Sequence, residues 1–122
     1  MKVKAFSSPG RMESFRFAIN GLLRFFKEEP NARIHLCSSL LVTALGFWLQ
    51  LSMFEWILLV IVAGLVWVAE IINTAIERVM DFIQPGYDEK AGQIKDMAAA
   101  AVLISSIVAA VTGLFIFIPK IF

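Results

Sequence analysis

Residues 56–81 read WILLVIVAGLVWVAEIINTAIERVMD, and this segment is the strongest indication of the fold class. It carries no charge from Trp56 to Ala69, and its hydrophobic pattern continues beyond Glu70 to Ile76. A helix that crosses a bilayer needs about 20 predominantly apolar residues. We therefore predict a membrane helix over residues 56–80, with carboxylates in its second half.

Two other stretches, residues 34–51 and 97–118, are also apolar enough to cross a bilayer. Of the 122 residues, 59% are apolar and 17% are charged, whereas a water-soluble protein has about 45–50% apolar and about 25% charged residues. The net charge of +1 excludes bulk electrostatic attraction to nucleic acid. A single cysteine and a single histidine exclude an internal disulfide and a His/Cys metal cage. The chain is predicted to be one all-α integral membrane domain, residues 1–122, with three transmembrane helices.

Residues 12–28 show a helical period, with Phe15, Ile19 and Phe26 on one face and basic residues on the other. This pattern is typical of an amphipathic helix that lies in the membrane interface. The alternative is a cytosolic helix that packs on a loop. Residues 1–11 are expected to form a flexible lead-in.

The basic residues predict the orientation of the chain. Seven of the eleven precede or begin the first span, and the hairpin at residues 51–55 has none. Because cytoplasmic segments carry the excess of Lys and Arg, we expect the N-terminus and the connection at residues 80–96 to be cytoplasmic. The hairpin and the C-terminus then face outward.

A row of polar side chains follows one face of the second predicted span. Glu70, Asn73, Glu77 and Asp81 are spaced at i, i+3, i+7 and i+11, which places them within a sector of about 80° on a helix. An acidic residue at the centre of a membrane helix raises the free energy of insertion by roughly 2.5–3.5 kcal/mol. The presence of several polar side chains on one face therefore indicates a specific function or a specific packing role. Glu70, the deepest member, suits a general base that meets a lipid hydroxyl. The alternative is a hydrogen-bonding stripe that fixes packing or oligomeric state.

Further charges gather on the predicted cytoplasmic side. Glu29 precedes the first span, and Lys95 with Asp96 precedes the third. An oxygen set such as Glu29 with Glu77 suits Mg²⁺ rather than zinc. Lys95 would supply positive charge to a polyphosphate, or alternatively anchor the helix at the cytoplasmic surface. No P-loop motif is present. The whole pattern favours phosphoryl transfer to a lipid.

Two segments resemble a known family. Residues 69–81 (AEIINTAIERVMD) resemble the signature Glu-x-x-Asn-Ser/Thr-Ala-x-Glu-x-x-x-Asp of the prokaryotic diacylglycerol kinases. Residues 91–103 (AGQIKDMAAAAVL) resemble the family's second landmark, a Lys-Asp pair followed by small residues and Ala-Val-Leu. The tetrapeptide Arg33-Ile34-His35-Leu36 is more similar to the undecaprenol kinase branch than to the diacylglycerol kinase branch.

The resemblance implies a homotrimeric lipid kinase of the bacterial inner membrane, with three-span subunits and active sites shared between them. Such enzymes use Mg²⁺ and ATP to phosphorylate the hydroxyl of diacylglycerol or undecaprenol. By position, the resemblance implies that Glu70 is the catalytic base and that Asn73 orients Glu70 or the transferred phosphate. It implies that Glu29 and Glu77 are ligands of the ATP-bound Mg²⁺. The ATP contacts that it implies are Lys95, Asp96 and Tyr87.

The family's Tyr-His pair is Tyr87-Asp88 in this chain, and Arg11 follows the position of an ATP-binding arginine. The roles of Asp88 and Arg11 stay open. We expect His35 to anchor the first span at the membrane interface rather than to act in catalysis.

A second function class is a small proton-coupled transporter of the multidrug type. It would use Glu70 to exchange protons with a cationic substrate, but it gives Glu77, Lys95 and Asp96 no task. A purely structural subunit explains the spans and none of the charges.

Overall fold

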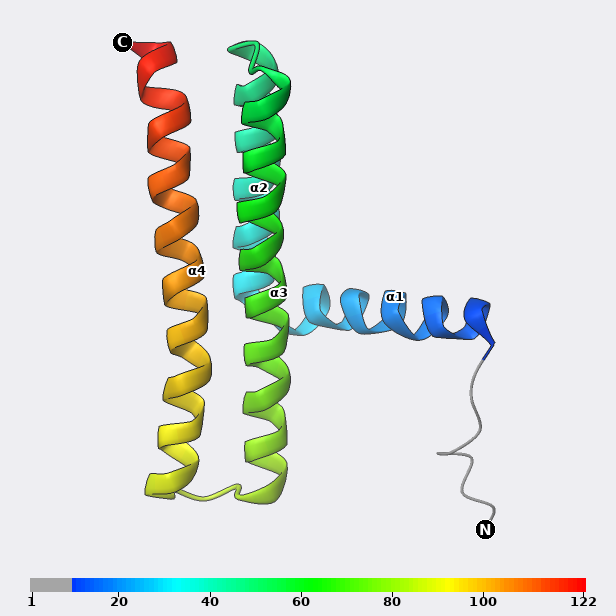
Figure 1. Ribbon diagram of the computed structural model, residues 1–122. Coiled ribbons are helices and arrows are strands. Elements are labelled where there is room, and N and C mark those ends of the chain that lie inside the picture. The colour runs from blue at the N-terminus through cyan, green and yellow to red at the C-terminus, as the bar shows by residue number, and fades with distance from the viewer. Residues whose placement is uncertain (1–9) are drawn as a thin grey trace. The chain divides into compact units, whose positions relative to one another are not determined.

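The computed structural model describes residues 10–122, and these residues form four α-helices and no strand (Figure 1). Residues 1–9 of the expected lead-in lie outside the described part, and Arg11 is already the first helical residue. The chain divides into two compact units at Ile34 and His35. The helices are α1 (Arg11–Glu28), α2 (Pro30–Trp48), α3 (Met53–Ile83) and α4 (Glu89–Ile121).

In the first unit, α1 ends where a proline forces the backbone out of the helical conformation. The residue before a proline avoids the α region, and Glu29 is accordingly extended, with φ −107° and ψ 114°. Pro30 becomes the first residue of α2, a position at which its missing N–H is not needed. The Arg33 guanidinium donates to the carbonyl oxygens of Phe26 and Lys27 at 3.3 and 2.8 Å. These bonds satisfy carbonyls in the last turn of α1 that have no partner within the helix.

In the second unit, α3 and α4 run antiparallel side by side, and α2 lies along α3 (Figure 1). Near the turn between α2 and α3, a small core forms around Leu51, Leu59 and Ile116. At the same end, Lys120 Nζ lies 3.2 Å from Glu55 Oε2. The ion pair and the core together hold the end of α4 against the start of α3.

Two helices of the described chain, α3 and α4, are long and apolar enough to cross a membrane, and most of their apolar surface is exposed. At 31 and 33 residues they are about 46 and 50 Å long, more than the roughly 30 Å of a hydrocarbon core. The expected first span, residues 34–51, falls on α2, which is not one of these two helices. Helix α4 begins eight residues before the expected span because Asp88 Oδ2 accepts the Ala91 N–H at 2.9 Å and caps it.

The turn between α2 and α3 is held by the backbone. The Leu51 and Gln50 N–H groups donate to the carbonyls of Gly46 and Phe47 at 3.2 and 3.3 Å, as in a Schellman motif. Gln50 occupies the left-handed position, with φ 56°. A Cβ atom on Gly46 would lie 2.6 Å from Trp56 Cη2. The close approach of α2 to α3 at this turn therefore requires glycine.

We expect Gly46→Val to lower the free energy of unfolding by about 1–3 kcal/mol, because the added atoms overpack the site against the Trp56 ring. The measurement is the midpoint of thermal unfolding in detergent. Gly21→Ala on α1 is the control, since nothing lies within 4 Å of a Cβ at that position. Combining Gly46→Val with Trp56→Phe should recover part of the loss. An unchanged midpoint for Gly46→Val would show that the contact is not tight.

Candidate functional site

The polar row predicted from the sequence lies on one uninterrupted helix, α3. Glu70 is buried, with 8% of the residue exposed, Asn73 and Glu77 are half-buried, and Asp81 is exposed. At about 1.5 Å per residue, Glu70 and Asp81 are separated by roughly 16 Å along the helix. The row therefore runs from a protected environment to an open one.

Glu70 is held by a residue of α2. His35 Nε2 lies 2.7 Å from Glu70 Oε1, and the imidazole is 28% exposed. When Glu70 is ionised, its carboxylate can only accept hydrogen bonds, and the imidazole N–H is then the donor. His35 was expected to anchor the first span at the membrane interface, and its contact with Glu70 was not predicted. Its only signal was a histidine within an apolar segment, since the two residues are 35 positions apart.

An indole of α3 supports the same region. Trp67 Nε1 donates to Ser39 Oγ at 3.1 Å, and the rings of Trp67 and His35 are 6.3 Å apart. This second tie between α3 and α2 lies one helical turn of each helix away from the Glu70–His35 contact. Two side-chain hydrogen bonds therefore fix the register of α2 against α3 beside Glu70.

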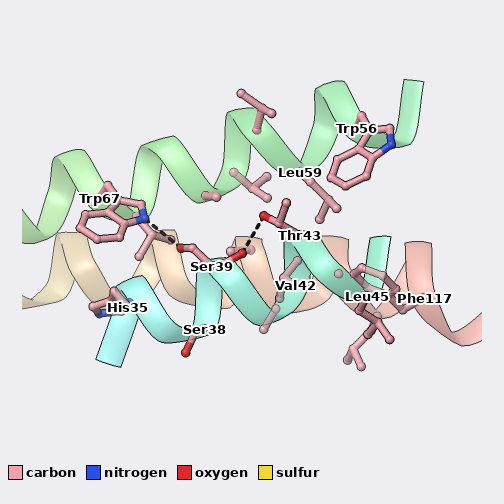
Figure 2. Close-up of a pocket in the computed structure, with 18 residues that line it drawn as sticks. His35, Ser38, Ser39, Val42, Thr43, Leu45, Trp56, Leu59, Trp67 and Phe117 are labelled. Carbon is pink, nitrogen blue, oxygen red and sulfur yellow. Dashed lines mark hydrogen bonds between the residues drawn. The ribbon is translucent and has the colours of Figure 1, made fainter. Parts of the chain in front are cut away.

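A groove of about 570 Å³ begins at His35 and is lined by α2, α3 and α4. Figure 2 shows His35 and Trp67 at one end and Trp56 and Phe117 at the other. Its lining is almost entirely apolar, and α4 contributes only small and apolar side chains such as Gly113. A groove of this kind suits a hydrocarbon chain whose polar end lies at His35, the partner of Glu70.

The middle of the row offers oxygen atoms without protein partners. Asn73 Oδ1 is buried and accepts no hydrogen bond. Glu77, one helical turn further, makes no hydrogen bond or ion pair within residues 10–122. The described residues contain no group of three or more His, Cys, Asp or Glu side chains that could hold a metal ion by itself. A cation bound here would therefore need further ligands from a molecule bound together with it or from another chain.

The outer end of the row is joined to α4 by an ion pair between Asp81 and Lys95. Asp96 follows Lys95 and is exposed, and Tyr87 lies in the turn between α3 and α4 with 96% of its surface exposed. Glu29 belongs to the first unit, at the end of α1, and Glu77 belongs to the second unit. The structure thus brings Asp81 to Lys95 and His35 to Glu70. It does not place Glu29 relative to the row.

Comparison with known proteins decides the family. Residues 16–117 match the family described as prokaryotic diacylglycerol kinase. The chain belongs to the prokaryotic diacylglycerol kinase family. It is therefore a lipid kinase, and its apolar helices α3 and α4 agree with the membrane location of such a protein.

Individual relatives of this kinase carry two names. The undecaprenol kinase of Bacillus subtilis (strain 168) is 33% identical over 108 residues, which cover 88% of each chain. The diacylglycerol kinase of Escherichia coli (strain K12) is 44% identical over 96 residues, which cover 79% of each chain. The diacylglycerol kinase of Haemophilus influenzae is 32% identical over 94 residues, covering 77% of this chain and 80% of the relative.

The ion pair between Asp81 and Lys95 is largely solvent-exposed, so we expect it to contribute little to the stability of the kinase. In a double-mutant cycle of Asp81→Asn and Lys95→Met, the coupling energy should be at most about 1 kcal/mol and should shrink with added salt. Unfolding midpoints in detergent at low and high salt measure it. A salt-independent coupling of about 3 kcal/mol or more would show instead that the pair is buried.

Proposed function

We propose that this protein transfers the γ-phosphoryl group of ATP to the hydroxyl of a membrane lipid, diacylglycerol or undecaprenol, with Mg²⁺ as the cofactor. The observation that carries the proposal is the position of Glu70. This carboxylate is buried, it is held by a residue at the mouth of an apolar groove, and it shares a helix face with Asn73 and Glu77. The family and the names of the relatives support the same reaction.

On the lipid side, the hydrocarbon tail occupies the groove and the hydroxyl lies beside Glu70. Glu70 accepts the hydroxyl proton while the lipid oxygen forms its bond to the γ-phosphorus. The bond from that phosphorus to the oxygen bridging to the β-phosphate breaks, and ADP leaves with the electron pair. Asn73 orients the carboxylate or the transferred group from one turn away. Positioning and charge neutralisation supply most of the acceleration in such transfers.

On the nucleotide side, the donor set fits Mg²⁺, which takes one or two carboxylates together with substrate phosphates and water. The half-buried Glu77 carboxylate and the Asn73 oxygen without a partner are suitable oxygen atoms, and Glu29 is the second proposed carboxylate. Bound there with ATP, Mg²⁺ would neutralise the charge that develops on the phosphate oxygens.

Three residues near the turn between α3 and α4 complete the proposed nucleotide site. Lys95 has three ammonium donors, and its contact with Asp81 leaves others for phosphate oxygens. Asp96 and Tyr87 are both exposed and are the other proposed ATP contacts.

In the membrane, we propose that α2, α3 and α4 all cross the bilayer and that α1 lies in the cytoplasmic interface. The N-terminus is cytoplasmic, in accordance with the basic residues that precede α2. The membrane is the inner membrane of a bacterium. The exposed apolar surface of α3 and α4 and the incomplete carboxylate cluster support a homotrimer with shared active sites.

The proton-coupled transporter remains the alternative class for a buried membrane glutamate. It gives no role to Glu77 or to the ion pair of Lys95. Transfer of label from [γ-³²P]ATP into a lipid extract by the purified protein separates the two functions, because a transporter leaves the extract unlabelled.

Between the two acceptors, we expect undecaprenol to be phosphorylated with the higher kcat/KM. The tetrapeptide Arg33-Ile34-His35-Leu36 and the relative of Bacillus subtilis favour it, and the groove suits a single hydrocarbon chain. Direct competition between both lipids in mixed micelles measures the ratio. A clear preference for diacylglycerol would reverse this assignment while leaving the kinase reaction intact.

Glu70→Gln should lower kcat by at least about 100-fold, because the amide keeps the shape of the carboxylate but cannot accept the hydroxyl proton. The measurement is lipid phosphorylation by the purified variant, with its unfolding midpoint as the check on folding. Near-normal turnover would remove Glu70 from the role of base.

Glu77→Gln should raise the concentration of Mg²⁺ needed for half-maximal activity several-fold, because one anionic ligand is lost. A Mg²⁺ titration at saturating ATP measures this shift. Glu89→Gln, a change in the first turn of α4, is the matched control and should leave the titration unchanged. If both variants titrate like the parent protein, Glu77 is not a metal ligand.

A further inference from the structure

We propose that His35 is a positioning residue for the kinase reaction: it fixes one oxygen of the Glu70 carboxylate so that the other faces the lipid hydroxyl. This inference rests on the proposed function, because it gives Glu70 the role of base. It adds a residue of α2 to a site that the sequence motifs place on α3 and α4.

The geometry supports this role. The 2.7 Å contact joins His35 Nε2 to Oε1 of the carboxylate, and Oε2 makes no hydrogen bond or ion pair within residues 10–122. A glutamate side chain has three rotatable bonds, and a free carboxylate would sample several positions. Because misplacement of a reacting group by 1 Å can cost about 100-fold in rate, an oxygen held by a donor is a substantial advantage.

No other polar group of the described residues holds Glu70. Within residues 10–122, the carboxylate makes its hydrogen bond and ion pair to His35 alone. The part of α4 that lines the adjoining groove contributes only Ala109, Ala110, Gly113, Leu114 and Phe117, none of which is charged. A buried carboxylate needs a hydrogen-bond donor, and His35 is the donor that the fold provides.

The imidazole is itself fixed. Trp67 lies beside the ring, and its indole N–H is committed to Ser39, one turn further along α2. This arrangement holds the segment of α2 that carries His35 against α3. The donor therefore approaches Glu70 from a defined direction rather than from a mobile chain.

A hydrogen bond that only joins α2 to α3 would have the same geometry. The test therefore needs two variants that are equally polar but differ in how far the side-chain donor extends toward Glu70. In His35→Gln, the amide nitrogen can extend to about the position of Nε2. In His35→Asn, the same amide is one methylene shorter and falls short of Glu70. Both variants are polar and neutral. Cys37→Ala, an exposed position two residues along α2, is the control for general disturbance of the helix.

We expect His35→Gln to keep kcat within about threefold of the parent protein and His35→Asn to lower it at least tenfold. The KM for ATP and the unfolding midpoint should match in both, because an interaction needed only in the transition state changes kcat rather than binding. Equal kcat values for the two variants, or losses that follow a lower midpoint, would overturn the proposal. If the parent protein labels neither lipid, the proposed function itself fails, and the role of His35 fails with it.

Discussion

A carboxylate buried in an apolar helix is the constraint on which the second unit depends. Glu70 must be paired, because an unpaired buried charge costs several kcal/mol. The partner comes from α2, so α2 must lie against α3 at this level. The hydrogen bond from Trp67 to Ser39 and the close approach at Gly46 hold the same pair of helices along the rest of their contact. The groove that begins at His35 follows from this packing.

The opposite end of the row obeys a different rule. Asp81 lies near the end of α3, where the helix extends beyond the length that a hydrocarbon core requires, and its partner Lys95 is on the similarly extended start of α4. Charged side chains outside the hydrocarbon core carry little desolvation cost, and they remain accessible to solvent. In the proposed reaction, this helix face therefore passes from the lipid end of the site to the nucleotide end. Phosphoryl transfer between a membrane lipid and ATP requires this kind of junction.

Much of this arrangement could be predicted from the sequence. The spacing of Glu70, Asn73, Glu77 and Asp81 depends only on helical periodicity, and α3 is one continuous helix, as that prediction requires. The end of α1 at Glu28 follows from Pro30. Local rules of this kind act within a few residues, so they can be read directly from the chain.

What the sequence did not reveal depends on contacts between distant segments. The pairing of His35 with Glu70 joins two helices, and no periodicity in either helix specifies its partner. The groove likewise arises from three helices together. The early start of α4 was missed because hydropathy locates the apolar part of a helix, whereas the Asp88 cap determines where the helix begins.

In the proposed reaction, two carboxylates on one helix face have different tasks: Glu70 acts on the lipid and Glu77 holds the metal. Thiolates favour soft metal ions, so the most direct measurement is metal rescue of Glu77→Cys and Glu70→Cys, each in a Cys37→Ala background. We expect Cd²⁺ to restore lipid phosphorylation to Glu77→Cys and not to Glu70→Cys. Rescue of Glu70→Cys, or of neither variant, would contradict it.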